Sequence, residues 1–278
     1  MSLSYSRRLM TDRVMKGLTF LAAIVALVPL FLILTDLFLK GIGSVNGAFF
    51  TELPRPVGET GGGMANAIAG TFYLIGLACL VGLPVGICGG IYLSEFGKGK
   101  LGATVRFAAD LLNGTPSIVI GIFVYAVVVL PMKSFSALAG GIALGILMIP
   151  TVLRTTETMM QLVPQSLREG ALALGVPYWR TLLSVVLRTA RGGILTGILL
   201  SIARVAGETA PLLFTALGNQ FFSLYWDQPI AALPLQIFNF AISPFEEWRA
   251  QAWAGALVLI GLILTLNVSS RIFMRAKR

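Results

Sequence analysis

The sequence predicts an all-α, polytopic membrane protein with six transmembrane helices. Of its 278 residues, 56% are hydrophobic and only 12% are charged, and the mean hydropathy is +0.86. The charges gather between long apolar stretches, each of which approaches or exceeds the roughly 20 residues that a helix needs to cross a bilayer. The expected spans are residues 17–39, 60–94, 111–132, 134–153, 192–218 and 250–270.

A single membrane domain, residues 17–278, is expected to follow a short N-terminal segment, residues 1–16. The first apolar run is longer than the core of a signal peptide and no cleavage motif of small residues follows it, so we expect it to remain as a helix. Basic residues near span ends are retained on the cytoplasmic side of a membrane. With the N-terminus inside, the outer loops hold only Lys40, Arg55, Lys133 and Arg249 of the 21 basic residues. Both termini are therefore expected in the cytoplasm.

The composition excludes several functional classes. The chain has no histidine, which rules out a Ser-His-Asp triad, a histidine-ligated metal and a histidine proton relay. Cys79 and Cys88 lie on roughly opposite faces of one apolar span, without a second pair to complete a metal site. No G-x-x-x-x-G-K-S/T motif is present, so we expect neither a bound nucleotide nor an enzyme. The net charge of +9 is explained by topology and anionic lipid rather than by nucleic acid.

The connection between the fourth and fifth spans, residues 155–190, is rich in helix signals. Pro164 and Pro177 suit the first turns of two short helices, and Gly175 suits the left-handed residue just past a helix end. Each short helix has one apolar face. Such a pair either rests in the membrane interface or docks to a partner in the cytoplasm.

This loop resembles the signature of ABC importer permeases, in which Glu-Ala-Ala is followed by Gly and then by an Ile-x-Leu-Pro pattern. The matching positions hold Glu169, Ala171, Gly175, Val185 and Leu187, whereas Gly170 and Arg188 depart from the pattern. The resemblance implies a MetI-like permease fold with cytoplasmic coupling helices that dock to a separate ATPase. The residues it assigns to that contact are Leu167, Arg168, Glu169, Ala171, Gly175 and Pro177.

Further stretches are similar to the phosphate permeases of the phosphate-specific transport system. They are residues 70–95, 110–121, 154–157 and 203–216, and the last of them favours the A-type of the two membrane subunits. The resemblance implies a complex in the bacterial inner membrane that imports inorganic phosphate by alternating access. It also implies the partners, namely a second, homologous permease, two copies of an ABC ATPase, and a periplasmic or lipid-anchored phosphate-binding protein.

The fifth predicted span carries two charges at membrane depth, Arg204 and Glu208. An ionisable side chain there costs on the order of 2.5–3.5 kcal/mol and usually faces a bundle interior or a wet cavity. The helical spacing of 3, 4, 3 and 4 predicts one polar stripe, formed by Ser201, Arg204, Glu208, Pro211 and Thr215. The candidate pathway residues of this span are Ser201, Arg204, Glu208, Thr209 and Thr215.

The chemistry of this stripe suits an oxyanion. A guanidinium such as that of Arg204 presents a planar fork to two phosphate oxygens, and hydroxyl groups donate to the others. Because phosphate keeps at least one proton at neutral pH, the Glu208 carboxylate can accept that hydrogen bond and repel a fully deprotonated anion. The alternative is that Arg204 and Glu208, one helical turn apart, neutralise each other and fix the packing of the helix.

The third predicted span carries a second polar stripe, formed by Asp110, Asn113, Ser117 and Gly121 at helical spacing. These residues either line the pore, or Asp110 favours a helix start through the dipole while Asn113 bonds to a neighbouring helix. At the cytoplasmic end of the next span, Arg154 and Glu157 are expected to pair.

The outer loop at residues 219–249 is rich in aromatic residues, which suit either a belt at the membrane surface or a docking surface for the binding protein. The acidic residues Asp227, Glu246 and Glu247 favour the docking surface. The aromatic residues are Phe221, Phe222, Tyr225, Trp226, Phe238, Phe240, Phe245 and Trp248.

Three other functions fit parts of this pattern. An ion-coupled secondary transporter would use the buried charges but not the docking loop, and the paired half-molecule repeats found in many such folds are not evident. A membrane scaffold would use the loop but not the buried charges. A permease for sulfate or molybdate would use both, and differs from the favoured function only in its substrate.

Overall fold

The computed structural model describes residues 2–59 and 61–275, with side chains for 7–59 and 61–269. Helices dominate it, and within these residues the only β pairing is an isolated bridge between Leu217 and Ile230. The helices are α1 (Ser2–Gly41), α2 (Gly47–Thr51), α3 (Ala65–Phe96), α4 (Lys100–Gly114), α5 (Ser117–Val124), α6 (Leu130–Met132), α7 (Ala137–Gln161), α8 (Gln165–Ala173), α9 (Tyr178–Thr181), α10 (Leu187–Ala206), α11 (Ala210–Leu213), α12 (Leu233–Ala241) and α13 (Glu246–Arg275). Short π-helical turns, Tyr125–Val129 and Leu182–Val186, join α5 to α6 and α9 to α10.

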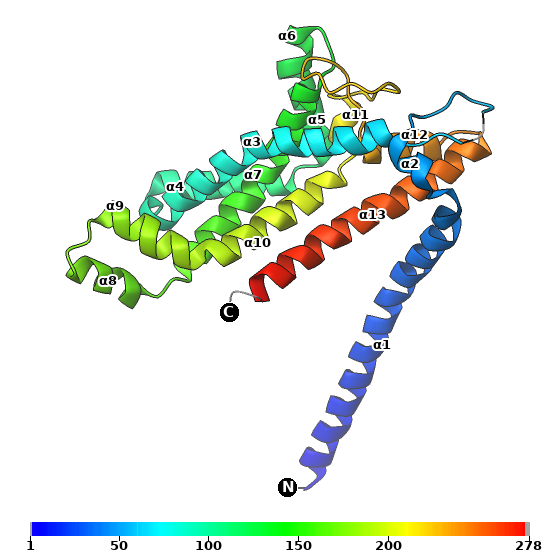
Figure 1. The fold of residues 1–278 in the computed structure, drawn as a ribbon. Helices are drawn as coiled ribbons and strands as arrows, with labels where there is room; N and C mark the ends of the chain where they lie inside the picture. Colours follow the sequence, from blue (N-terminus) through cyan, green and yellow to red (C-terminus); the bar gives the residue numbers. More distant parts are fainter. Residues whose placement is uncertain (1, 60, 276–278) are drawn as a thin grey trace.

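Four long helices, α3, α7, α10 and α13, form the body of the molecule (Figure 1). Helix α7 lies at its centre and packs on α3, α10 and α4. In the described chain, five helices are long and apolar enough to span a membrane, and the bent pair of α4 with α5–α6 makes a sixth crossing if it is counted as one span. The predicted class, an all-α membrane protein with six spans, is confirmed in this form.

The third predicted span, 111–132, is not a straight helix. Helix α4 ends at Gly114, and the chain then turns by 104° into α5. The cause is Pro116, whose ring disfavours helical geometry at the preceding residue; Thr115 accordingly has an extended backbone, with φ −75° and ψ 132°. The expected continuous stripe from Asp110 to Gly121 is therefore wrong, because the break separates Asp110 and Asn113 from Ser117 and Gly121.

The fifth predicted span, 192–218, is displaced along the chain. One continuous helical rod runs over Tyr178–Ala206 and includes the second short helix of the coupling loop, which is thus not separate. The rod ends where the N–H groups of Gly207 and Glu208 donate to carbonyls only three residues earlier, those of Arg204 and Val205. Pro211, within the first turn of α11, has no N–H to continue the ladder.

Helices α3 and α7 meet through glycines. Gly82, Gly86 and Gly90 form one edge of α3, and a Cβ atom placed on any of them would lie 2.5–2.9 Å from an atom of α7. The absence of side chains lets the backbones approach closely, which is how helices without a hydrophobic driving force gain packing contacts in lipid. This pair therefore forms a tightly joined unit.

The N-terminus of α7 is held by the loop that follows α11. The backbone N–H groups of Ser136, Ala137 and Leu138 donate to the carbonyls of Thr215, Gln228 and Trp226, at 3.0, 2.9 and 2.9 Å. These bonds satisfy donors that a helix start leaves unpaired. They fix residues 215–228 against the bundle.

Helix α1 leaves the body at an angle (Figure 1). All its described side chains from Arg7 to Asp36 are exposed, and its first buried residue is Leu37. Near its end, Gly41 touches the backbone of Trp253 on α13, and the Lys40 ammonium lies 4.9 Å from the Trp253 ring centroid. The predicted segment 1–16 belongs to this same helix where it is described.

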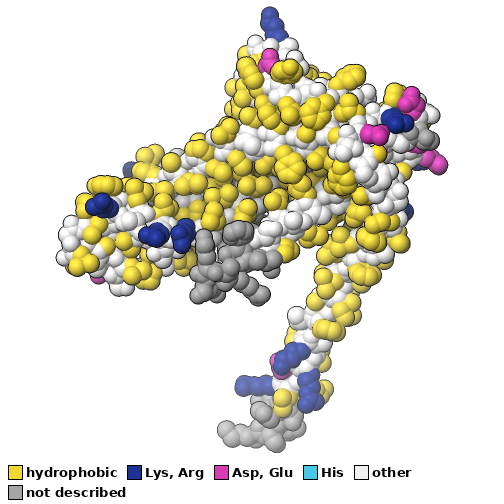
Figure 2. Space-filling model, in the orientation of Figure 1, with side chains coloured by type: hydrophobic (Ala, Val, Ile, Leu, Met, Phe, Trp, Pro, Cys, Tyr) yellow, Lys and Arg dark blue, Asp and Glu magenta, His cyan; other side chains and the backbone are white. Residues whose placement is uncertain are grey.

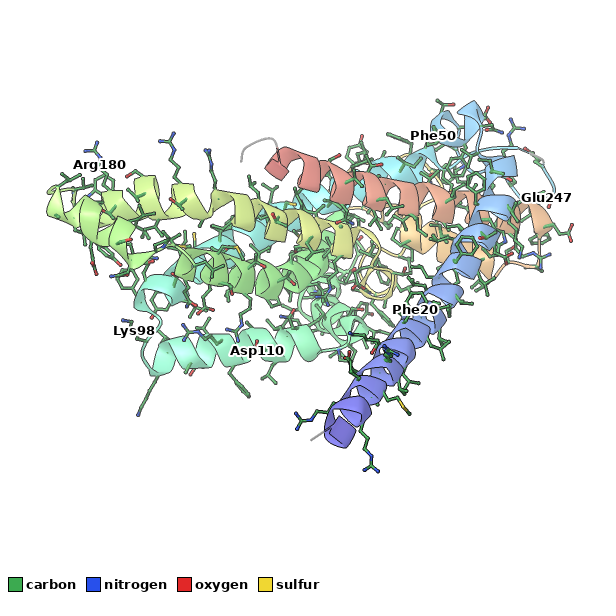
Figure 3. All side chains as sticks on the ribbon, turned by 90° about the horizontal axis from the view of Figure 1, so that it is seen from below. Phe20, Phe50, Lys98, Asp110, Arg180 and Glu247 are labelled. Atoms are coloured by element: carbon green, nitrogen blue, oxygen red, sulfur yellow. The ribbon has the colours of Figure 1, made fainter. Side chains whose placement is uncertain are left out.

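The two ends of the body differ in character. Lys98 and Arg180 lie at the end that carries α8 and α9, whereas Phe50 and Glu247 lie at the opposite end, near α12 (Figure 3). Between the ends, the visible face is mostly hydrophobic (Figure 2). We refer to these as the α8 end and the α12 end.

Candidate solute pathway and coupling helix

Arg204 and Glu208 lie on either side of the break between α10 and α11. Arg204 is in the last turn of α10 and is exposed in the isolated chain, and Glu208 follows Gly207 and is half-buried. Among the described residues, neither side chain makes an ion pair or a hydrogen bond. The alternative that they neutralise each other is therefore wrong for this conformation, and so is the expected continuous stripe.

The hydroxyl residues of this segment are distributed differently from the expectation. Thr215 is fully buried, and its hydroxyl donates to the Pro211 carbonyl at 2.8 Å, so it offers no donor to a solute in this conformation. Ser201 is also buried, and its hydroxyl has no hydrogen-bond partner in the described structure. Thr209 is half-buried at the start of α11.

Helices α5 and α11, which follow the two breaks, touch at one contact. A Cβ atom placed on Gly121 of α5 would lie 2.6 Å from the Cα atom of Pro211 on α11. The glycine thus allows the two interrupted helices to touch at their breaks. Ser117, one turn earlier on α5, is half-buried, and the short helix α11 carries Thr209 at its start. Both breaks therefore belong to one region of the molecule.

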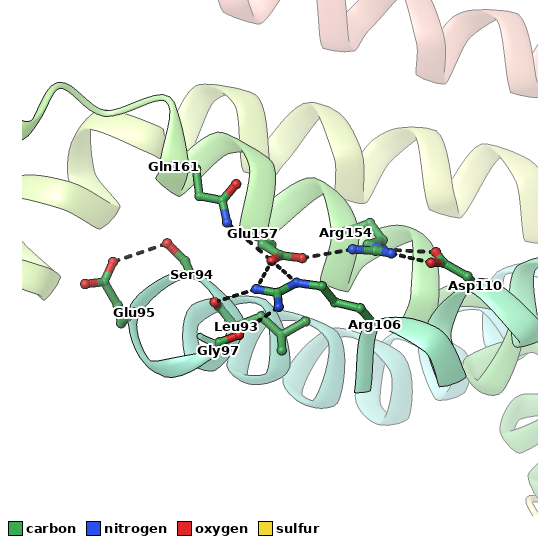
Figure 4. A network of polar contacts seen from close by, with 9 residues as sticks. All are labelled: Leu93, Ser94, Glu95, Gly97, Arg106, Asp110, Arg154, Glu157 and Gln161. Carbon is green, nitrogen blue, oxygen red and sulfur yellow. Dashed lines mark hydrogen bonds and ion pairs between the residues drawn. The ribbon is translucent and has the colours of Figure 1, made fainter. Parts of the chain in front are cut away.

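A charged network joins α4 to α7 (Figure 4). The Glu157 carboxylate, with only 5% of its side chain exposed, accepts from Arg106 Nε at 2.7 Å and from Arg154 Nη1 at 3.3 Å. Arg154 continues to Asp110, with Nε donating to Oδ1 at 3.1 Å. Arg106 also donates to the carbonyls of Gly97 and Leu93, at 2.7 and 3.1 Å.

This network settles the expectations for Asp110, Asn113 and Arg154. Arg154 and Glu157 do pair, as expected. Asp110 lies near the C-terminal end of α4 rather than at a helix start, so the dipole explanation is wrong and its partner is Arg154. Asn113 is exposed, and its side chain makes no hydrogen bond to another described residue. It remains available on the surface of α4.

The predicted coupling segment has the expected local geometry. Pro164 precedes α8, Pro177 precedes α9, and Gly175 adopts a left-handed conformation with φ +77° just past the end of α8. No residue of α8 is fully buried, and nothing lies within 4 Å of a Cβ atom placed on Gly175. Helices α8 and α9 with the turn between them form what we call the coupling elbow. Its exposed large apolar residues are Leu167, Leu172, Leu174, Tyr178 and Trp179. Glu169 is exposed and Ala171 half-buried on the same helix.

Arg168 differs from the expectation that it faces a partner. Its guanidinium turns inward and binds Glu95, the penultimate residue of α3, with Nη1 2.6 Å from Oε1 and 2.8 Å from Oε2. Glu95 was not among the predicted site residues, nor were Arg106 and Tyr178. A signal for Glu95 was present, because an acidic residue in the last turn of a helix opposes the dipole and needs a cationic partner.

The aromatic residues of the 219–249 loop divide into two groups. Phe240 is buried in the core and stacks on Trp248, with ring centroids 4.6 Å apart. Beside them, Asn219, Gln220, Gln236 and Asn239 contribute to a cavity of about 240 Å³. Six of these aromatic residues are exposed, namely Phe221, Phe222, Tyr225, Trp226, Phe238 and Phe245. All six are available to a membrane surface or a partner, and the first four, which precede α12, are called the exposed group below.

Comparisons with known proteins agree on the class of this molecule. Residues 82–278 match the family model described as a binding-protein-dependent transport system inner membrane component. The phosphate transport system permease protein PstA of Yersinia pestis is 53% identical over 86% of this chain and 81% of its own length. The chain belongs to the PstA family of these transport components. The PstA protein of Pasteurella multocida is 47% identical, over 97% of this chain and 96% of its own length.

Solved structures support the fold independently. An inward-facing form of the MetNI methionine ABC transporter superposes with a TM-score of 0.61 at 17% identity, covering 77% of this chain and 96% of the other. An amino acid ABC transporter superposes with a TM-score of 0.56 at 18% identity, covering 77% and 92%. The predicted MetI-like permease fold is thereby confirmed.

Proposed function

We propose that this chain is one membrane-channel subunit of an ATP-driven importer of inorganic phosphate. The α8 end faces the cytoplasm together with both chain termini, and the α12 end faces the periplasm. The support for this orientation is the concentration of Lys and Arg at the α8 end, as the retention of basic residues on the cytoplasmic side requires. The chain itself performs no covalent chemistry.

The observation that carries the proposal is the pair of unpaired charges at the break between α10 and α11. A charged side chain in an apolar span is costly unless it meets water, a ligand or a counter-charge, and within the described chain Arg204 and Glu208 have no counter-charge. A phosphate passing the break would supply one. The PstA proteins to which the chain is similar are named as permeases of a phosphate transport system.

The two side chains have complementary roles in this proposal. The Arg204 guanidinium binds two phosphate oxygens with two parallel N–H donors. The Glu208 carboxylate accepts a hydrogen bond from the P–O–H group that phosphate retains, and that sulfate lacks, at neutral pH. The break between them leaves backbone groups outside the helical ladder, and at membrane depth irregular backbone is tolerated only where it is buried in protein or lines a water-filled cavity.

The partners follow from the surfaces that the chain leaves open. Two copies of an ABC ATPase bind the coupling elbows of this chain and of a second, homologous permease. That second permease completes the channel on the side that Arg204 faces and covers part of α1. A periplasmic or lipid-anchored phosphate-binding protein delivers the solute at the α12 end, where the exposed group Phe221, Phe222, Tyr225 and Trp226 lies.

Replacing Arg204 tests the pathway role. In the complete complex reconstituted into liposomes, Arg204→Ala is expected to lower ATP-dependent phosphate uptake at least about tenfold, because one charge-assisted hydrogen bond to an anion contributes about 1.5–3 kcal/mol. Assembly, followed by copurification of the subunits, should survive. Arg13→Ala, which removes an exposed guanidinium from α1, is the matched control and should leave uptake unchanged.

Three outcomes would count against the proposal. Normal uptake by a well-assembled Arg204→Ala complex would remove Arg204 from the pathway. Uptake that persists with a hydrolysis-deficient ATPase would show that transport is not ATP-driven. Competition by unlabelled phosphate but not by sulfate is expected, and inhibition by sulfate alone would assign a different oxyanion.

A further inference from the structure

An ion pair separate from the network of α4 and α7 connects the coupling helix α8 to the bundle. Arg168 Nη1 contacts both oxygens of Glu95, at 2.6 and 2.8 Å, and its Nη2 donates to the Met160 carbonyl at 2.9 Å. The Tyr178 hydroxyl and the Ser94 hydroxyl also donate to the Glu95 carboxylate. One carboxylate thus joins the end of α3 to α8 and to the start of α9.

This pair is well shielded from solvent. The Glu95 side chain is 3% exposed and that of Arg168 is 16% exposed. By contrast, the rest of α8 presents mostly exposed residues, and within the described structure no other side chain of this helix makes a hydrogen bond or an ion pair. Arg168 is therefore the polar anchor by which α8 is held to the chain.

We infer that Glu95 is a positioning residue for energy coupling, because its pair with Arg168 makes α8 and the end of α3 move as one body. Separating the pair would leave a carboxylate buried at a helix C-terminus, where both desolvation and the dipole oppose it. A displacement of α8 is thus transferred to α3 rather than absorbed by the loops at 162–164 and 174–177. The inference rests on the proposed function, since it presupposes a partner that moves α8.

Two further contacts connect the ion pair of Glu95 and Arg168 to helix α7. Gly90, which precedes Glu95 on α3, is packed directly against Thr156 and Leu153 of α7. Met160, whose carbonyl accepts from Arg168, is buried on the last turn of the same helix. The displacement of α8 therefore reaches α3 and α7 together, and these helices are a tightly joined unit.

The consequence is specific to coupling. Loosening the pair should let α8 follow its partner without moving α3, so ATP would be hydrolysed without transport. A merely structural role would lower the amount of assembled complex, but would leave the number of phosphate ions carried per ATP unchanged.

The test uses the complete complex in liposomes, with ATP hydrolysis and phosphate uptake measured on the same samples. Glu95→Gln keeps the shape of the side chain and removes its charge. The phosphate carried per ATP is expected to fall about tenfold, as for the loss of one charged hydrogen bond, while hydrolysis changes by less than about twofold. Asp12→Asn is the matched control, because it makes the same change in an exposed ion pair with Lys16, and should keep the ratio.

A second variant covers the case in which Glu95→Gln does not assemble. Arg168→Lys keeps the charge but has one nitrogen in place of two, so it cannot bind Glu95 and the Met160 carbonyl as Nη1 and Nη2 do, and the same ratio should fall. An unchanged ratio in whichever of the two variants assembles would overturn the inference.

A covalent replacement of the pair provides the rescue. Both native cysteines are replaced, and Glu95→Cys and Arg168→Cys are joined by a flexible bis-thiol reagent. The cross-linked complex should regain most of the phosphate carried per ATP that the uncrosslinked variant has lost. A cross-linked complex that regains none of it would count against the pair. The proposed function fails separately, if the wild-type complex shows no ATP-dependent phosphate uptake.

Discussion

The buried carboxylate of Glu157 is shared by two guanidinium groups from different parts of the chain. Arg106 reaches it from α4, and Arg154 from the preceding turn of α7. The Gln161 amide donates to the same carboxylate at 3.3 Å. A buried ion pair contributes little net stability when it forms, but removing one partner leaves the others without compensation. Glu157 therefore holds α4 against α7.

Glu157→Gln should destabilise the chain, because both arginines lose their common counter-charge. Each guanidinium is about one-third exposed, so solvent screens part of the loss. We expect about 2 kcal/mol, which lowers the midpoint of thermal unfolding in detergent by about 4–8 °C. Asp12→Asn should shift it by less than about 1 °C, and an equal shift in both variants would contradict the assigned role.

Some residues of the candidate site could be predicted from the sequence, and others could not. Arg204 and Glu208 were identifiable, because their charges interrupt an apolar run. The left-handed Gly175 and the prolines before α8 and α9 were predictable from local backbone preference. Arg106 and Glu95 were not assigned, because their partners lie 51 and 73 residues away in sequence and only the tertiary fold brings them together.

Helix pairs in this molecule are specified by backbone contact as much as by side chains. Because α3 presents Gly82, Gly86 and Gly90 to α7, the two helices pack without intervening side chains along this edge. Gly76 lies on the same helix, and a Cβ atom placed on it would have no neighbouring atom within 4 Å. The two classes of glycine on one helix provide a direct comparison.

Gly90→Val should disrupt the pair of α3 and α7. Its Cβ atom would lie 2.5 Å from Thr156 Cβ and 2.6 Å from the Leu153 carbonyl oxygen, so the helices must separate. We expect a loss of about 1–3 kcal/mol or more, as for other overpacked sites. Gly76→Val is the matched control and should keep the wild-type unfolding midpoint. A normal midpoint for Gly90→Val would show that the contact is loose.

The helical breaks are the elements that periodicity did not predict. Hydrophobic spacing continues through Pro116 and through Gly207, so residues 111–132 and 192–218 each read as one span. The dihedral restriction before proline decides the first break. The second depends on Gly207, Pro211 and the contact of Pro211 with Gly121, which is a tertiary feature. Both breaks fall at the candidate pathway.

The whole chain is an open structure rather than a closed bundle. Helix α1 extends away from the body, and a large share of the apolar surface faces outward (Figures 1 and 2). Six spans, their order and the all-α class could be predicted from length and charge distribution. The direction of α1 could not, since only its last turns contact the body.

A pair of substitutions on α1 tests this arrangement. Leu37 is 4% exposed against the body, whereas Phe20 is 70% exposed. Leu37→Ala should cost about 2–5 kcal/mol of the free energy of unfolding of the purified chain, as buried leucines usually do. Phe20→Ala should cost less than about 0.5 kcal/mol. The reverse order, measured by thermal unfolding in detergent, would mean that α1 folds back onto the body.

The start of α7 is held by main-chain atoms of the loop after α11, and a carbonyl accepts a hydrogen bond whatever side chain its residue carries. The exposed aromatic side chains of Phe221, Tyr225 and Trp226 can thus be substituted during evolution without moving the backbone that carries them. Relatives that bind different soluble binding proteins would then differ in these side chains and share the same backbone conformation.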